Sequence, residues 1–157
     1  METKELTIAI NGYKSPELLR LCLQSVFQHI KSDIDYEVLV TDSATEEETE
    51  MLMREEFPEV KFFPFRENVG FQTMVNISLK SARGKYIFLI NSDIILTDAV
   101  VSRMLDYLKT HPDVGILSPK QLNFNGTLQP SCFRFYRPLT ILYRRTWFGK
   151  LHFAKHH

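Results

Sequence analysis

Short apolar segments alternate with longer amphipathic segments along most of this 157-residue sequence. The short segments are rich in β-branched and aromatic residues, which is typical of buried strands. The longer segments carry apolar residues three and four positions apart, the spacing of one buried helix face. This alternation predicts an α/β fold with a doubly wound, mostly parallel sheet. The predicted strands lie at about residues 7–10, 36–40, 60–63, 86–90 and 114–117, and the predicted helices at about 16–29, 45–57, 71–82 and 98–109.

Local signals mark several ends of these elements. Ser15 directly before Pro16 is a favourable start for a helix. Thr45 followed three residues later by Glu48 matches a capping box at the start of the second helix. Asn125-Gly126 between two apolar segments predicts a β-hairpin with a type I′ turn.

Charge divides the chain into two predicted parts. Residues 1–130 carry 13 Lys and Arg against 19 Asp and Glu, whereas residues 131–157 carry six basic residues and no acidic one. The composition, with 44% apolar residues, 6 Gly and 7 Pro, excludes a collagen-like or wholly disordered chain. The two cysteines match no metal-binding or disulfide pattern. We therefore predict a globular domain at 1–130 and a basic aromatic segment at 131–157.

The basic aromatic segment has two interpretations. Residues 138–148 place apolar and aromatic side chains on one side of a predicted helix and Arg144 and Arg145 on another, as in a helix that lies on anionic lipid. Alternatively, its aromatic residues cover the core of the protein. The absence of a nucleic-acid motif and the acidic body argue against nucleic-acid binding. Without a signal peptide or a predicted membrane span, we expect a cytoplasmic protein, which under the first interpretation would contact the inner face of the membrane through residues 131–157.

Three predicted strands end in polar residues, at 11–14, 41–43 and 91–93. Because parallel strands bring their carboxyl ends to one edge, where such sheets bind ligands, these residues are candidates for a shared site. The first turn has neither a dinucleotide fingerprint nor a P-loop. Asp93 could hold a divalent cation that neutralises a diphosphate, and Tyr13 could stack on a base. Asp42 and Asp93 have a plain alternative as turn or capping residues.

Five segments of the chain together match a known pattern, in this order: Ile10–Leu19, Val40–Thr45, Glu67–Phe71, Ala82–Tyr86 and Leu89–Asp93. They resemble the nucleotide-sugar-binding half of family 2 glycosyltransferases with the GT-A fold. The similarity runs from Leu6 to Gln129, about four-fifths of the chain, and is closest to rhamnosyltransferase-like members. It implies that the protein binds a nucleoside-diphosphate sugar with Mg²⁺ or Mn²⁺ and transfers the sugar, with inversion, to a glycan or lipid-linked acceptor.

The resemblance also implies roles for single residues. Asp42 matches the acidic residue that hydrogen-bonds the nucleobase, and Asp93 matches the last carboxylate of the D-x-D motif, which binds the cation. Asn91 replaces the first Asp of that motif and would face the ribose. Lys14 stands where Asn is usual and could contact a phosphate. The other implied donor-binding residues are Tyr13 in the base-pocket turn and Asn68, Gly70 and Asn76 beside the donor.

The family's catalytic base has no counterpart in this sequence. Family members continue into an acceptor-binding part with an acidic motif, whereas the last acidic residue here is Asp113. An inverting transfer needs a base to deprotonate the acceptor hydroxyl. The catalytic residue is therefore unassigned, and a second function stays open: a non-catalytic module with the nucleotide-sugar fold, used for assembly or membrane docking. An incomplete core also predicts a homo-oligomer.

Overall fold

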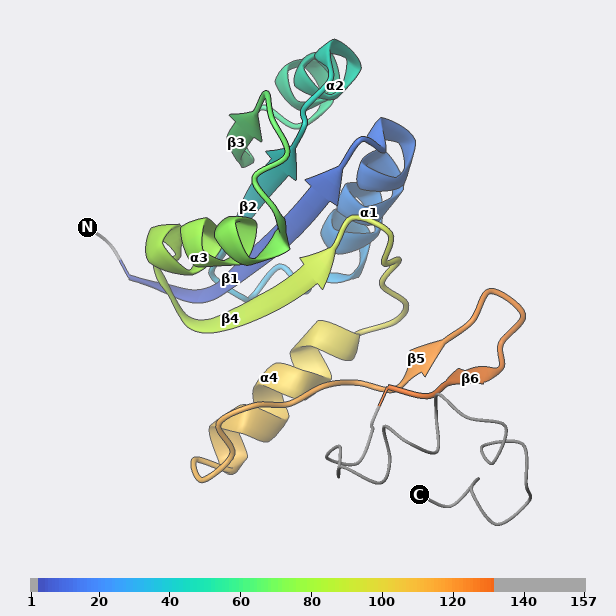
Figure 1. Cartoon of the computed structure of the whole chain (residues 1–157). Helices are drawn as coiled ribbons and strands as arrows, with labels where there is room; N and C mark the ends of the chain where they lie inside the picture. The colour runs from blue at the N-terminus through green and yellow to red at the C-terminus, as the bar shows by residue number, and fades with distance from the viewer. Residues whose placement is uncertain (1–2, 132–157) are drawn as a thin grey trace, which may run out of the picture. The chain divides into compact units, whose positions relative to one another are not determined.

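The computed structural model describes residues 3–131 (Figure 1). Helix α1 has the predicted bounds, whereas the strands run further than the apolar segments that predicted them. The first strand, for example, continues through Asn11-Gly12, which the sequence suggests as a turn. The elements are β1 (Lys4–Tyr13), α1 (Pro16–His29), β2 (Tyr36–Ser43), α2 (Glu47–Glu56), β3 (Lys61–Phe65), α3 (Phe71–Ser81), β4 (Gly84–Asn91), α4 (Val100–Thr110), β5 (Gln121–Leu122) and β6 (Leu128–Gln129).

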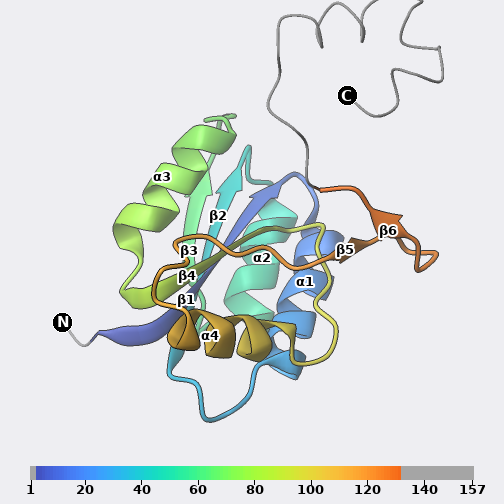
Figure 2. The same cartoon turned by 90° about the horizontal axis from the view of Figure 1, so that it is seen from below.

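The first four strands form a parallel sheet in the order β3-β2-β1-β4. The chain moves outward from β1 through β2 to β3, and then crosses to the other side of β1 to form β4. Figure 2 shows α3 on one side of this sheet and α1 and α2 on the other. The predicted doubly wound, mostly parallel α/β fold is therefore confirmed. The strand order reverses between β1 and β4, and such a reversal is where α/β sheets bind ligands.

The apolar core lies mainly on the α1 and α2 side of the sheet. Alternate residues of β1 and β2 point to this side, and the apolar faces of both helices cover them. Burial of each large aliphatic side chain contributes about 1.5–3 kcal/mol to folding. The α3 side is more polar, because Thr41 and Ser78 are buried there and their hydroxyls lie 2.9 Å apart. The central core residues include Ile8, Ile10, Leu19, Leu23, Val26, Val38, Val40, Leu52 and Met53.

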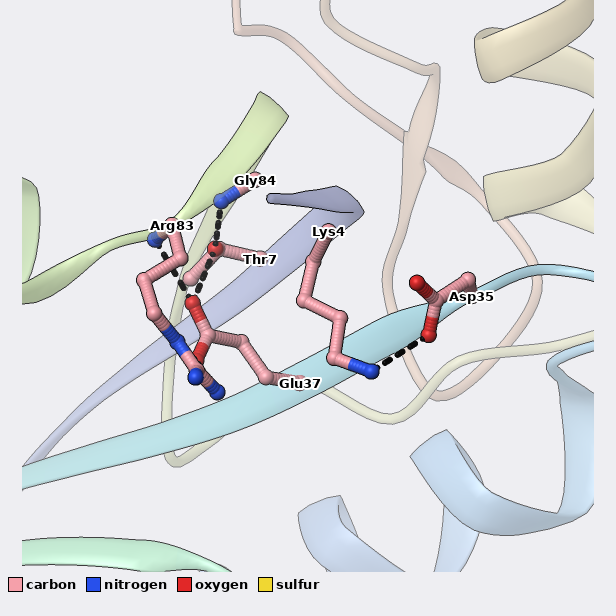
Figure 3. A network of polar contacts seen from close by, with 6 residues as sticks. All are labelled: Lys4, Thr7, Asp35, Glu37, Arg83 and Gly84. Carbon is pink, nitrogen blue, oxygen red and sulfur yellow. Dashed lines mark hydrogen bonds and ion pairs between the residues drawn. The ribbon is translucent and has the colours of Figure 1, made fainter. Parts of the chain in front are cut away.

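A polar network joins three strands at the amino end of the sheet (Figure 3). The Glu37 carboxylate on β2 accepts hydrogen bonds from the Thr7 hydroxyl on β1 and from the backbone N–H and guanidinium of Arg83, all at 2.7–2.8 Å. The Gly84 N–H at the start of β4 donates to the same Thr7 hydroxyl at 2.8 Å. The network connects β2, β1 and β4 at the end of the sheet opposite to the predicted site.

Three local predictions are wrong. Residues 114–117 form no strand, because no other strand among the described residues pairs with them, and Ile116 is exposed. The hairpin at 121–129 is present, but its turn is not type I′. That turn needs a positive φ at both central residues, and of Asn125 and Gly126 only the glycine has one. The capping box is absent, because α2 begins at Glu47 and the Thr45 hydroxyl donates to the Asp42 carbonyl at 2.8 Å.

The chain divides into two compact units, Met1–Leu117 and Ser118–His157. Within the described residues, the first unit holds the four-stranded sheet and helices α1 to α4, and the second holds the β5-β6 hairpin. The predicted membrane-contacting segment lies outside the described residues from 132 onward, so the boundary at 130/131 stays a prediction. Among residues 3–131, no helix has both the length and the apolar character to cross a membrane.

Candidate functional site

The three predicted polar strand ends lie at one edge of the sheet. Asn11 near the end of β1 pairs with Thr41 on β2 and with Asn91 on β4. Gly12, the next residue of β1, pairs with Asp42. Because one strand separates β2 from β4, their backbones lie about 10 Å apart, twice the usual spacing between neighbouring strands. The sheet thus places an acidic residue on each side of β1.

Asp42 is an acidic side chain almost fully removed from solvent. Its exposed fraction is 2%, and its Oδ2 atom has no hydrogen-bond partner. Burial raises the pKa of the Asp42 carboxyl, the Thr45 hydroxyl opposes this shift, and the charge of Glu46 adds to it. Buried polar atoms nearly always have a partner, so a buried acceptor without one calls for an explanation. A ligand that brings a hydrogen-bond donor to Oδ2 would supply the missing partner.

Tyr13 ends β1 at the same edge, and Lys14 directly follows it. The Tyr13 ring is 49% exposed, so it offers a free aromatic surface. Lys14 has a φ of 47°, in the left-handed region that non-glycine residues seldom occupy. Its ammonium lies 5.9 Å from the centre of the Tyr13 ring. The pair presents one flat apolar surface and one positive charge to solvent.

The loop before α3 is attached to the end of β2 by Ser43. The Ser43 hydroxyl accepts the Val69 N–H at 2.9 Å and lies 3.3 Å from Oδ1 of Asn68. Asn68 in turn accepts the N–H of Gly70 at 3.0 Å, and Gly70 is the N-cap residue directly before α3, with a φ of 78°. The Asn68 side chain therefore shapes this loop, and its role in binding a ligand stays a prediction. These contacts hold the start of α3 beside the carboxyl end of β2.

Asp93 lies in the turn that follows β4. This turn is fixed to β1 because the Ser92 N–H donates to the Asn11 carbonyl at 2.9 Å. The Asp93 side chain is exposed, yet it lies near α1. Burial raises the pKa of the Cys22 thiol on α1 to about 12, and the charge of Asp93 adds to this shift. Further along, the Ser25 hydroxyl accepts the Leu96 N–H at 3.0 Å, which attaches the same loop to α1.

The structure sets a limit on cation binding. In the range 3–131, no three or more His, Cys, Asp or Glu side chains are grouped to hold a metal ion. Asp93 is an exposed carboxylate at the strand reversal, and carboxylate oxygens are ligands that Mg²⁺ and Mn²⁺ accept. This donor set fits a cation that takes one protein carboxylate and completes its shell with ligand oxygens and water. It does not fit a cation held by the protein alone.

Residues with a strained backbone lie in the loops that follow three of the four parallel strands. Three non-glycine residues between 3 and 131 have a positive φ, and they lie in the loops after β1, β2 and β4: Lys14 at 47°, Ala44 at 53° and Asp98 at 50°. Such conformations cost about 1–3 kcal/mol each and occur preferentially at functional sites.

The predicted residues do not all lie together. Tyr13, Lys14, Asp42, Asn91 and Asp93 lie on the strand ends or directly after them, and Asn68 and Gly70 adjoin them through Ser43. Asn76 belongs neither to the strand ends nor to this loop, and is an exposed residue in the second turn of α3.

The sequence places Asn11 and Gly12 at this edge but gives neither residue a role of its own. The side chain of Asn11 is 4% exposed, its Oδ1 lies 3.4 Å from the Ser78 hydroxyl, and its Nδ2 has no partner. Gly12 has no predicted role because Asn11-Gly12 indicates a turn, whereas both residues pair within β1. An uninterrupted strand through Asn-Gly leaves no distinctive pattern in a single sequence.

The strand order, the crossovers and the polar carboxyl edge define a doubly wound α/β domain with a candidate ligand-binding edge. A family model described as glycosyl transferase family 2 matches residues 7–157, and the chain belongs to this family. The predicted family is therefore confirmed. No curated protein sequence matches the chain.

Solved structures show the same fold at low sequence identity. Residues 1–349 of TarS from S. aureus, also solved in complex with UDP and with UDP-GlcNAc, superpose with a TM-score of 0.61 and 18% identity over 69% of this chain. The mannosyltransferase PcManGT from Pyrobaculum calidifontis, in complex with GDP-Man and Mn²⁺, gives 0.57 and 20% over 69% of this chain. The chain spans about a third of each of these two structures, with 33% coverage.

Proposed function

We propose that this protein binds a nucleoside-diphosphate sugar at the carboxyl edge of its sheet and serves as the donor-binding part of a glycosyltransferase. The observation that carries the proposal is the buried Asp42 carboxylate, whose Oδ2 lacks a partner. In this proposal a nucleobase N–H donates a hydrogen bond to Oδ2. A hydrogen bond to a charged acceptor contributes about 1.5–3 kcal/mol. Two structural neighbours recorded with UDP, UDP-GlcNAc or GDP-Man support this ligand class.

The other residues of the edge suit the remaining parts of such a ligand. In this proposal Tyr13 stacks on the base, Lys14 contacts a phosphate as a point charge and Asn91 faces the ribose. The separation of about 10 Å between β2 and β4 leaves room for a ribose between base and diphosphate. Asn68, Gly70 and Asn76 are proposed to border the donor from the loop and helix beyond β3.

A divalent cation is proposed to bind at Asp93. Mg²⁺ or Mn²⁺ there would neutralise the diphosphate and stabilise its departure as a Lewis acid. With Asn91 in place of a second carboxylate, the cation depends on phosphate oxygens for most of its ligands. We therefore expect cation and nucleotide to bind cooperatively, and the neighbour solved with GDP-Man and Mn²⁺ agrees with such joint binding.

The transfer step is also a proposal. The sugar would pass with inversion to a glycan or lipid-linked acceptor, and a rhamnosyl donor is the specific candidate. The base that takes the acceptor proton has no assigned residue in this chain. The residues of the edge would hold the donor and its leaving group, and a cytoplasmic location at the inner membrane face would suit a lipid-linked acceptor.

The change in thermal stability when a nucleotide is added tests the proposal directly. Thermal unfolding is measured with UDP, dTDP and GDP, each with and without Mn²⁺. A ligand present at 100 times its dissociation constant stabilises the folded state by about 2.7 kcal/mol. Asp93→Ala should abolish the effect of Mn²⁺, Asp42→Ala should weaken discrimination between bases, and Asp113→Ala, in the exposed turn after α4, should match the wild type. Unchanged melting with every nucleotide would contradict the proposal.

A non-catalytic assembly module is the second candidate, and the outer strand β4 favours it. Ile87 and Leu89 on this strand are 41% and 38% exposed, which leaves apolar surface available to another chain. In this case the protein would form homo-oligomers or dock on a membrane through residues 131–157. Sedimentation alone and with anionic liposomes, for the chain with and without 131–157, tests both modes. Oligomerisation or liposome binding without any nucleotide effect would favour the module.

A further inference from the structure

Gly12 is the residue of β1 that lies directly beside Asp42. The two residues pair across the β1-β2 ladder. A Cβ atom built on Gly12 would lie 2.5 Å from Oδ1 of Asp42 and 3.5 Å from its Cγ. Real Cβ atoms essentially never come within 3.0 Å of another heavy atom. The Asp42 carboxylate therefore occupies the space that a side chain at position 12 would need.

The need for glycine here is steric and not conformational. Among the glycines between 3 and 131, Gly70 and Gly126 have a positive φ, whereas Gly12 lies in a regular strand. Any residue could adopt the backbone of Gly12, so only the close approach of Asp42 selects against a side chain. This distinguishes Gly12 from the turn glycines.

We propose that Gly12 is a positioning residue: by leaving its Cβ space empty, it allows the Asp42 carboxylate to lie across β1 and so sets where a ligand's hydrogen-bond donor is bound. The inference rests on the proposed nucleotide-binding role of Asp42. A methyl group at position 12 has to displace Oδ1 by at least about half an ångström before the contact becomes tolerable. Hydrogen-bond distances span about 2.7–3.2 Å, so such a shift is enough to lose a well-aligned bond.

The displaced carboxylate has little freedom to recover its place. Asp42 is 2% exposed, and the Thr45 hydroxyl binds its backbone carbonyl at 2.8 Å, which fixes the chain at this point. The carboxylate can then move only by rotating about its side-chain bonds, which changes the direction of Oδ2. A side chain at position 12 should therefore alter ligand binding through Asp42, without touching the ligand itself.

Gly12→Ala tests this inference, and Gly115→Ala is the matched control because a Cβ at Gly115 meets nothing within 4 Å. The dissociation constants for UDP and for GDP, each with Mn²⁺, are measured by calorimetry. Gly12→Ala should weaken binding of the preferred nucleotide about tenfold or more, which is the value of a hydrogen bond to a charged group. Gly115→Ala should bind as the wild type does.

A double variant separates positioning from a general structural effect. If Gly12 acts through Asp42, then Gly12→Ala combined with Asp42→Ala should bind no more weakly than Asp42→Ala alone. The titration of Asp42, followed by NMR of its carboxyl carbon in the ligand-free protein, should also shift in Gly12→Ala and not in Gly115→Ala. Wild-type affinity in Gly12→Ala together with weakened Asp42→Ala would overturn the inference.

Normal nucleotide binding by Asp42→Ala and failure of Gly12→Ala to fold would each be informative. If Asp42→Ala binds both nucleotides normally, the proposed role of Asp42 in binding fails, and the NMR titration alone decides whether Gly12 positions its carboxylate. If Gly12→Ala does not fold, the double variant should fold, because removal of the carboxylate makes room for the methyl group. Failure of the double variant to fold would show that the contact with Asp42 is not the reason for glycine and would overturn the inference.

Discussion

The backbone of Lys14 is strained, whereas its positive charge is proposed to contact a phosphate. Its φ of 47° costs a non-glycine residue about 1–2 kcal/mol. Lys14→Gly should therefore stabilise the protein by about 1 kcal/mol in urea unfolding, while weakening nucleoside-diphosphate binding because the positive charge is lost. Ala44→Gly, at a φ of 53°, is the control, and it should stabilise similarly without removing a charge. A loss of stability in both variants would show that these conformations are not strained.

The charge of Asp42 is proposed to bind a nucleotide, but it lowers the stability of the ligand-free protein. Because burial raises its folded-state pKa, ionisation of Asp42 destabilises the ligand-free protein. This cost is fully present above the folded pKa and disappears as the pH falls below the unfolded pKa. Asp42→Asn should accordingly raise the melting temperature at pH 8 by more than at pH 4, and it should weaken nucleotide binding. An equal change at both pH values would show that the carboxylate charge is not the cause.

At the scale of elements, sequence periodicity predicts most of the fold. The Ser15-Pro16 start and the apolar spacing of α1 give its bounds correctly, since both signals are local. Residues 114–117 have the composition of a strand and form none, because a strand needs a partner and partners are not encoded locally. Thr45 has the spacing of a capping box, yet its hydroxyl binds Asp42 and Phe65 instead.

The candidate site is predicted less completely than the fold. Polar residues at strand ends indicate the edge on which the site lies, because parallel strands share their direction. Burial of Asp42, its missing partner and the closeness of Gly12 depend on the register between β1 and β2. No local pattern in one sequence specifies that register, so these features become visible only in three dimensions.

The network around Glu37 joins three strands, and its loss should be measurable. Burial alone would raise the pKa of Glu37, but hydrogen bonds from Arg83 and Thr7 and the charge of Arg83 outweigh it and lower the pKa. Its stabilising contribution is therefore present above the unfolded pKa and is lost as the pH falls through the folded pKa. Because Arg83 is partly exposed, Glu37→Gln should cost about 1–3 kcal/mol at pH 7.

Urea unfolding between pH 3 and pH 7 measures this effect. The difference between wild type and Glu37→Gln should shrink toward pH 3, because the wild-type carboxylate is then protonated. The exposed Glu59→Gln is a suitable control, since Glu59 lies in the turn before β3 and outside this network. A difference that does not depend on pH would mean that packing, and not charge, stabilises this end of the sheet.

At the scale of the whole sheet, the two ends of the strands differ in how far their polar groups are hydrogen-bonded. The amino end carries a satisfied network, with Glu37 accepting several hydrogen bonds, and the carboxyl end carries unpartnered polar atoms and strained residues. The stabilising network and the proposed binding site are thus at opposite ends of the same strands. A rigid parallel sheet allows this division, because its backbone hydrogen bonds hold the register between the ends.

The two ends should consequently respond independently to substitution. Glu37 and Asp42 are five residues apart on β2, which corresponds to about 17 Å along an extended strand. Sites separated by more than about 7–10 Å without shared partners usually show additive changes in stability. At pH 7, Glu37→Gln combined with Asp42→Asn should therefore give the sum of the two single changes within about 0.5 kcal/mol, measured by urea unfolding. Glu37→Gln alone should leave the affinity for UDP and GDP unchanged. A larger interaction energy, or weaker nucleotide binding in Glu37→Gln, would show that the amino end of the sheet controls the geometry of the carboxyl end.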